Sequence, residues 1–482
     1  MKYQLHCLAC SRPTADFGDW FAQGQRCACG SPRADLVYQS DYAGLDPLLR
    51  GRPESFWHYF DFLPLLDRSH LVTRGEGVPE LQRWDFLEDH ARRHHGLDCR
   101  VVAARNDLNG GTGTFKDVAA AMAAALFQEW GVARFVIAST GNIATAYAAY
   151  LAWAGVELTA FLPQGHNQSS AAEIRRLGQE VRVIPGTYAD AKRAAADFAA
   201  RHHLLISAGN IDPIRVESKR TMVFEFLRQL GRLPDVYLQA VSGGTGPIAL
   251  DKGLRELSRV GWQPAASRDR RAPRPGPAPE PAADGAGPAR ETSPLTTAAP
   301  RDQLPFLPTA AGDGSDPGQS AGWSTGERRP GGRLVGPRLV LSQLDTCDPM
   351  VQGWERAVAA GFPAGWERSY PVIERPATAV TTLATGDPAM FPTLAPLVQT
   401  SGGAFVRVRE AELVAGGRWL AAESGLTLGP ASIACLLGFD QALAQGLIHD
   451  GDLVALNPGE GAGRAGGFAR AVAGEAVLTP AS

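Results

Sequence analysis

Apolar runs of strand length alternate with helix-length segments between about residues 99 and 262. The apolar runs lie at 135–138, 158–162, 181–184, 204–206 and 236–241. The helix-length segments lie at 117–130, 142–154, 169–178, 188–202 and 217–230. Strands that alternate with helices at this spacing are typical of a mainly parallel sheet with helices on both faces. The pattern therefore predicts an α/β fold.

The alternation stops near residue 262 and resumes at residue 337. The segment 263–335 is dominated by Pro, Gly, Ala, Arg, Asp and Ser. Such a composition buries too little apolar surface to offset the entropy lost on ordering, so we predict a disordered insertion there. Beyond it we expect strands at 337–341, 405–408 and 452–456, helices at about 409–423 and 430–446, and a loose Gly/Ala-rich tail at 461–482.

Length and charge limit the classes of protein that fit. A chain of 482 residues with 44 % hydrophobic residues can form two or three domains with sizeable cores. A net charge of −3 implies no strongly basic face, so nucleic acid is not an expected partner. No apolar run reaches the ~18 residues of a membrane span, and the first residues lack the apolar core of a signal peptide. We expect a soluble cytoplasmic protein with no membrane partner.

Four of the seven cysteines fall within the first thirty residues. They are Cys7, Cys10, Cys27 and Cys29, spaced as CxxC, sixteen residues, then CxC. This arrangement resembles a zinc ribbon, in which four thiolates form a closed tetrahedral site with no open position for catalysis. We predict a small zinc-ribbon-like module at residues 1–45 with a structural Zn²⁺. The alternative is a ribbon that has lost its metal.

The chain has five lysines, and Lys116 stands out because it follows a Gly/Thr-rich loop and precedes an alanine-rich helix. The positive end of the helix dipole and a partly apolar wall both disfavour the ammonium form of a lysine in that place. A neutral amine is what Schiff-base formation requires. On this motif alone, an ordinary solvated lysine on a first helical turn remains an equal alternative.

Two Gly-containing turns follow predicted strands and open predicted helices. The first consists of Ser242, Gly243, Gly244, Thr245 and Gly246. Its backbone N–H groups and helix dipole favour a phosphate, and the absence of a Walker lysine or a dinucleotide spacing favours a phosphate monoester. The second consists of Ser139, Thr140, Gly141 and Asn142, which suits a carboxylate or a phenolic oxygen. A plain tight turn and an N-cap are the respective alternatives.

The amine and the two turns all lie at carboxyl ends of strands in an open sheet, where such folds bind ligands. Pyridoxal 5'-phosphate (PLP) has matching parts: an aldehyde, a phosphate, and a ring oxygen beside the substrate carboxylate.

These motifs resemble those of the threonine synthase family, PLP enzymes of fold type II. The likeness extends over roughly 55–260 and 337–460. It implies a tryptophan synthase β-like fold with two α/β subdomains built from 46–262 and 336–460, and a homodimer would suit the family. It also implies the following roles: Lys116 as Schiff-base lysine and general base, Asn142 on the PLP ring oxygen, Ser139, Thr140 and Gly141 at the substrate carboxylate, residues 242–246 on the PLP phosphate, and Arg215 as the clamp for the phosphate of the substrate.

The reaction implied by the resemblance is elimination of phosphate from O-phosphohomoserine followed by addition of water. The chain departs from the family at Pro458, where a threonine that contacts the pyridine nitrogen is expected, and in its phosphate loop. Residues 239–241 and Asn457 look closer to cysteate synthase, which uses O-phosphoserine and sulfite. A threonine or serine dehydratase-like deaminase is a further alternative. The departure at Pro458 also leaves open a paralogue that binds a ligand or a partner protein.

Overall fold

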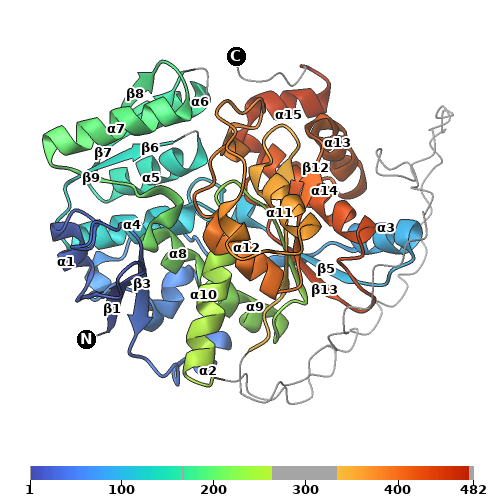
Figure 1. The fold of residues 1–482 in the computed structure, drawn as a ribbon, viewed down its shortest axis with the longest axis horizontal. Helices are drawn as coiled ribbons and strands as arrows, with labels where there is room; N and C mark the ends of the chain where they lie inside the picture. Colours follow the sequence, from blue (N-terminus) through green and yellow to red (C-terminus); the bar gives the residue numbers. More distant parts are fainter. Residues whose placement is uncertain (1, 140, 165–167, 263–333, 477–482) are drawn as a thin grey trace, which may run out of the picture.

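Two mainly parallel sheets form the body of the molecule, and a small antiparallel sheet packs beside them (Figure 1). The computed structural model describes residues 2–139, 141–164, 168–262 and 334–476. The six-stranded sheet has the order β12 (Ala404–Val408), β11 (Arg338–Leu344), β10 (Val236–Ala240), β13 (Leu453–Leu456), β5 (Arg100–Ala104), β4 (Leu81–Arg83). Its pairs are parallel except for the antiparallel β4–β5 pair.

The second parallel sheet has four strands in the order β8 (Glu180–Ile184), β7 (Glu157–Pro163), β6 (Arg134–Ala138), β9 (Leu205–Ile206). The antiparallel sheet has the order β2 (Pro13–Thr14), β1 (Tyr3–Cys7), β3 (Ala34–Tyr38). These sheets and the helices around them confirm the predicted α/β fold.

The α-helices that follow or precede these strands are α1 (Phe17–Ala22), α2 (Leu45–Leu49), α3 (Asp85–His95), α4 (Asp117–Glu129), α5 (Asn142–Trp153), α6 (Gln168–Arg176), α7 (Tyr188–His202), α8 (Pro213–Lys219), α9 (Met222–Leu230), α10 (Thr245–Arg259), α11 (Pro349–Ala359), α12 (Phe391–Thr400), α13 (Leu413–Ser424), α14 (Pro430–Ala444) and α15 (Gly466–Ala473). Short 3-10 helices lie at Phe56–Phe62, Arg68–His70, Asn106–Leu108, Gly209–Ile211, Trp366–Arg368, Thr381–Leu383, Glu410–Glu412 and Ala462–Arg464.

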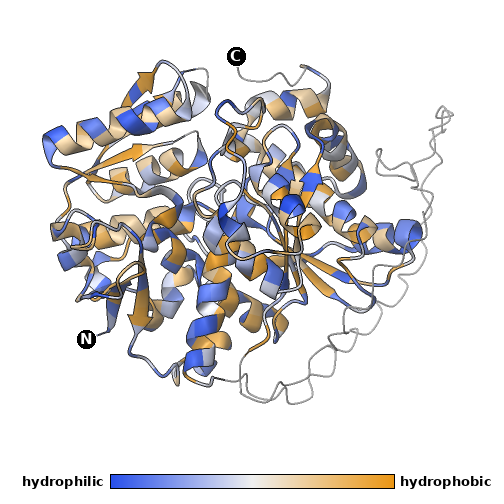
Figure 2. Ribbon diagram, viewed as in Figure 1, coloured by the Kyte–Doolittle hydropathy of each residue, from blue (hydrophilic) through white to orange (hydrophobic). Residues whose placement is uncertain are grey.

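Alternation along the central strands gives the six-stranded sheet two apolar faces. Leu339 and Leu341 of β11 pack into the core cluster that contains Phe391 of α12. Val340, between them, packs into the cluster that contains Ile433 of α14. Successive side chains of a strand point to opposite faces, so α12 and α14 cover opposite sides of this sheet. Figure 2 shows its strands as mainly apolar and the surrounding helices as mixed, as expected for a sheet buried on both faces.

Three sequence expectations differ from the structure or fall outside it. The helix expected at 217–230 is two helices, α8 and α9, separated at Arg220 and Thr221, where the hydroxyl of Thr221 donates to the carbonyl of Ser218 (3.2 Å). The loose tail expected at 461–482 is wrong for α15, whose Phe468 is buried with Leu420 of α13. Apart from residues 334 and 335, the insertion expected at 263–335 lies outside the described residues.

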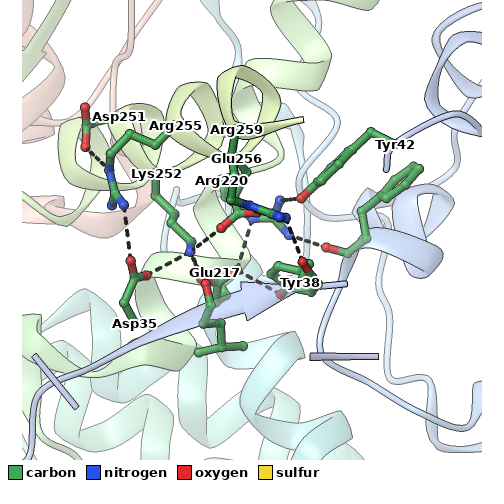
Figure 3. A network of polar contacts seen from close by, with 12 residues as sticks. Asp35, Tyr38, Tyr42, Glu217, Arg220, Asp251, Lys252, Arg255, Glu256 and Arg259 are labelled. Carbon is green, nitrogen blue, oxygen red and sulfur yellow. Dashed lines mark hydrogen bonds and ion pairs between the residues drawn. The ribbon is translucent and has the colours of Figure 1, made fainter. Parts of the chain in front are cut away.

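The N-terminal module is joined to the catalytic body by a buried network of charged side chains (Figure 3). Arg220 is completely buried, and its guanidinium pairs with Glu217 (3.0 Å) and donates to the hydroxyl of Tyr42 (2.7 Å). Lys252 of α10 pairs with Asp35 of β3 (2.9 Å). The network therefore fixes β3 against α8 and α10, two helices that line the cavity described below.

Among the described residues, no helix is both long and apolar enough to cross a lipid bilayer.

Candidate active site

A cavity of about 120 Å³ lies where carboxyl ends of strands from both parallel sheets face one another. The segments after β5, β6, β10 and β13 all contribute to its wall, as does α8. Of the residues expected to form the site, those that line this one cavity are Lys116, Ser139, Gly141, Asn142, Arg215, Ser242, Gly243, Gly244, Thr245 and Gly246. Thr140 lies outside the described residues. The structure thus brings together three motifs that are far apart in the sequence.

Lys116 is the residue immediately before α4 and is held there by the carboxylate of Asp117. This buried carboxylate accepts hydrogen bonds from the backbone N–H of Thr112 (3.0 Å), the hydroxyl of Thr112 (2.7 Å) and the N–H of Thr114 (3.2 Å). The Gly/Thr loop is therefore fastened to the helix that it precedes. Burial lowers the pKa of Lys116, and the charge of Glu460 partly opposes that shift. The site thus favours the neutral amine more than water does.

The Gly-rich turn after β10 has the shape of an anion cradle. Gly244 precedes α10 with φ +76°, a left-handed conformation that favours glycine. A Cβ on Gly243 would lie 1.7 Å from Nδ2 of Asn210, so only glycine allows this close approach. The first N–H groups of α10 have no carbonyl one turn before them and are available to an anion. The Oγ of Ser242 is hydrogen-bonded to the hydroxyl of Thr385.

Asn142 lies at the start of α5 and is held by Glu460, a residue that the sequence analysis did not include in the site. The Glu460 side chain is 2 % exposed and accepts hydrogen bonds from Asn142 Nδ2 and from the N–H of Ala431 (3.0 Å). Ser432 bonds both the backbone N–H and the carbonyl of Glu460. Burial raises the pKa of Glu460, and the positive charge of Lys116 opposes this. A fixed carboxylate thus lies in the wall between the amine and the amide.

Arg215 extends from α8 into the same cavity. It is 6 % exposed, and its Nη2 donates to Ser207 Oγ (2.7 Å). Its Nε has no hydrogen-bond partner within the part of the chain that the structure describes. Asp212, which caps α8 through the N–H of Ile214 (3.0 Å), likewise leaves Oδ2 without a partner there. Buried polar atoms are almost always hydrogen-bonded in a folded protein. Since Arg215 lines the cavity, its unpartnered Nε indicates a place for a polar ligand there.

The region around Pro458 is closed by a buried chain of hydrogen bonds. Asn106 Nδ2 donates to Asn457 Oδ1 (2.7 Å), and Asn457 Nδ2 donates to the hydroxyl of Tyr237 (2.6 Å). That hydroxyl donates to Oε1 of Gln239 (2.7 Å), which lines the cavity. Asn457 therefore uses its amide within the wall. Pro458, the position at which a threonine was expected, lies among these amide groups and accepts a hydrogen bond from Asn106 through its backbone carbonyl (2.9 Å).

The cysteines of the N-terminal module converge as predicted for a metal site. The Sγ atoms of Cys7 and Cys29 lie 3.6 Å apart, as do those of Cys10 and Cys27. All four sulfur atoms lie within 4.8 Å of one another. Tetrahedral Zn²⁺ with bonds of about 2.3 Å to sulfur would separate its ligands by about 3.8 Å. The geometry and the donor set therefore fit zinc.

The cavity also fits PLP by the chemistry of its wall: an amine whose charged form is disfavoured, an amide at a helix start, and a Gly-rich phosphate cradle. Sequence reasoning missed Glu460, Asn210, Lys219 and Gln239 among its lining residues. Gln239 was noted only for its likeness to cysteate synthase and was given no role in the site. The other three reach the cavity from segments that look like ordinary helix or loop.

Comparisons with known proteins agree with this chemistry. Residues 72–304 match the family described as "Pyridoxal-phosphate dependent enzyme". A threonine synthase of Methanocaldococcus jannaschii is 24 % identical over 443 residues, which cover 90 % of this chain and 87 % of the relative. A threonine synthase of Halalkalibacterium halodurans is 30 % identical over 199 residues, 41 % of this chain and 54 % of the relative. The chain thus spans about half the length of this second relative.

Solved structures share the fold. A diaminopropionate ammonia lyase from Escherichia coli aligns with a TM-score of 0.57 at 14 % sequence identity. The alignment covers 91 % of this chain and 94 % of the lyase chain. A threonine deaminase from Solanum lycopersicum aligns with a TM-score of 0.51 at 13 % sequence identity. The alignment covers 83 % of this chain and 84 % of the deaminase chain. Together, the family match over residues 72–304, the threonine synthase relatives and this fold show that the chain contains a pyridoxal-phosphate-dependent enzyme domain of fold type II and is similar to the threonine synthases.

Proposed function

We propose that this enzyme is a threonine synthase-like lyase that eliminates phosphate from O-phosphohomoserine and then adds water. The observation that carries the proposal is the buried guanidinium of Arg215, which lines the same cavity as Lys116 and whose Nε has no partner among the described residues. A buried arginine that forms no ion pair with a carboxylate of the described residues suits a phosphate, which it can contact with two parallel N–H groups. The threonine synthase relatives support the same reaction.

Each motif of the wall has a role in this proposal. In the loaded enzyme Lys116 would hold PLP, residues 242–246 would bind its phosphate, and Asn142 would hydrogen-bond its ring oxygen. The bound cofactor supplies an electron sink that stabilises negative charge at the substrate α-carbon. Ser139, Thr140 and Gly141 bind the substrate carboxylate.

Lys116 then has the proton-transfer role. Its Nζ lies in the cavity wall and, when not bound to the cofactor, would accept the proton from the substrate α-carbon. The burial that lowers the pKa of Lys116 keeps the amine able to accept that proton near neutral pH. Arg215 meanwhile holds the leaving phosphate and stabilises the charge that develops on it.

The test compares phosphate release by the wild type and by Arg215→Gln. We expect the wild type to release phosphate from O-phosphohomoserine and form threonine, and Arg215→Gln to lose about ten- to hundredfold in kcat/KM, the loss of a charge-assisted hydrogen bond. Arg201→Gln, on the outward face of α7, is the matched control and should be unaffected.

Other outcomes would replace the proposal. Phosphate release only from O-phosphoserine with sulfite would assign cysteate synthase-like chemistry. A keto acid formed only from serine or threonine would assign a deaminase. A wild type that takes up PLP but transforms none of these substrates would favour a paralogue that binds a ligand or a partner.

We further propose that Cys7, Cys10, Cys27 and Cys29 bind one structural Zn²⁺. Four thiolates leave no open coordination position, so the ion would stabilise the N-terminal module and take no part in the reaction. Metal analysis of the purified protein tests this, with about one equivalent of zinc per chain expected.

A further inference from the structure

Lys219 is a buried lysine in the cavity wall that the proposed reaction does not use. It is the last residue of α8 and is 4 % exposed. Its Nζ lies 3.4 Å from Oγ1 of Thr245, in the Gly-rich turn, and 5.6 Å from the centre of the Phe115 ring. No carboxylate of the described residues lies close enough to form an ion pair with it. Buried lysines are usually paired with a carboxylate, so a buried lysine with one long hydrogen bond to a neutral hydroxyl is unusual.

The charged groups around Lys219 favour the binding of an anion beside it. Burial lowers its pKa most, and the positive charges of Lys116 and Arg215 lower it further. Asp212 is the carboxylate that opposes this shift, and it faces Arg215 as well. Two further basic side chains, those of Arg215 and Lys219, therefore line the cavity beside Lys116. An uncompensated buried charge is costly, and a bound dianion would remove that cost by pairing with it.

The two cations of α8 reach different parts of the cavity. Arg215 and Lys219 are four residues apart and so lie on the same face of the helix. The guanidinium of Arg215 bonds Ser207 and lies 5.8 Å from the centre of the Tyr147 ring. The ammonium of Lys219 instead lies against Thr245 at the N-terminus of α10. The helix thus offers one cation to each of two anion positions.

We propose that Lys219 is the cationic ligand of the cofactor phosphate, which leaves Arg215 for the phosphate of the substrate. This inference rests on the proposed function, because it takes residues 242–246 as the PLP phosphate site. The Gly-rich turn contributes N–H groups and hydroxyls but contains no cation of its own. Lys219 would supply that charge from the neighbouring helix.

The test is the affinity of the apoenzyme for PLP and for pyridoxal, which lacks the phosphate. Absorbance and tryptophan fluorescence titrations would compare the wild type, Lys219→Gln and Lys219→Arg, with Lys192→Gln as a matched control on the exposed side of α7. We expect Lys219→Gln to weaken PLP binding about ten- to hundredfold and to change pyridoxal binding by less than about threefold. Lys219→Arg should restore most of the PLP affinity, and Lys192→Gln should match the wild type.

A purely structural lysine would behave differently. Lys219→Gln removes an unpaired buried charge, so its apoenzyme should melt at the wild-type temperature or above, while its gain in melting temperature on adding PLP should shrink. A lower melting temperature of the apoenzyme with equal loss of PLP and pyridoxal binding would overturn the inference.

Two further outcomes separate this inference from the proposed function. Unchanged PLP affinity in Lys219→Gln, with or without a raised KM for O-phosphohomoserine, would overturn the cofactor assignment and leave the proposed reaction standing. A wild type that binds PLP no better than pyridoxal would overturn both, because the Gly-rich turn would then not bind the cofactor phosphate.

Discussion

Replacing Arg220 by methionine should destabilise the protein more than any exposed arginine substitution. Arg220 is the centre of the network that joins the N-terminal module to α8 (Figure 3). Its guanidinium bonds the carboxylate of Glu217, the hydroxyl of Tyr42 and the carbonyl of Phe62. Methionine keeps most of the apolar volume and removes the charge and the donors.

The magnitude follows from what the substitution leaves behind. Glu217 is 1 % exposed and would retain a hydrogen bond from Tyr38 (2.8 Å) and a distant Lys252 (3.9 Å). Removing one partner of a buried ion pair costs about 3–5 kcal/mol, because the other charge is left uncompensated. Two acceptors would also lose their donor. We therefore expect Arg220→Met to lower the free energy of unfolding by about 4 kcal/mol.

Urea unfolding followed by tryptophan fluorescence and circular dichroism measures this loss. Arg134→Met is the matched control, since it removes an exposed pair with Glu157 (3.2 Å) and should leave the midpoint nearly unchanged. Adding Glu217→Gln to Arg220→Met should recover part of the loss, because glutamine leaves no charge unpaired. A loss of less than about 1 kcal/mol in Arg220→Met would refute the view that this network holds the module in place.

Three further predictions concern the two candidate sites. Burial lowers the pKa of Lys116 and the carboxylate of Glu460 opposes that shift, so Glu460→Gln should lower the pKa of Lys116 further. The pH midpoint for covalent attachment of PLP should therefore move down, and an upward move would contradict this. Cys27→Ser should reduce bound zinc from about one equivalent to near none and lower the melting temperature, and unchanged zinc content would exclude this cluster as the metal site. Gly243→Ala places a Cβ against Asn210 and should weaken PLP binding as measured by titration, with unaltered affinity as the contrary result.

Local chemistry made the main elements of the site predictable from sequence. Three segments could be recognised as anion or amine sites because the residues that make them so are adjacent in the sequence. They are the Gly-rich turn, the Gly/Thr loop before Lys116 and the turn before Asn142. The parallel sheets were predictable for the same reason, since buried strands read as short apolar runs. What these motifs could not supply was their mutual placement within one cavity.

Residues whose role depends on distant neighbours were not predictable. Lys219 follows a helix pattern that fits a solvated lysine, and its burial arises because α8 packs against both α4 and α10. Glu460 lies in a Gly-rich run and reaches Asn142 across 318 positions of the sequence. The break between α8 and α9 at Arg220 and Thr221 was not predictable either, because the pattern of apolar residues continues across it.

The central claim is that Lys116 is the lysine that holds PLP, and reductive trapping tests it most directly. The enzyme is loaded with PLP, reduced with borohydride and digested, and mass spectrometry locates the pyridoxyl group. The account predicts one label, on Lys116, together with a visible absorbance band that Lys116→Ala lacks. A label on Lys219, the other buried lysine of the cavity, or no label after loading, would contradict the account.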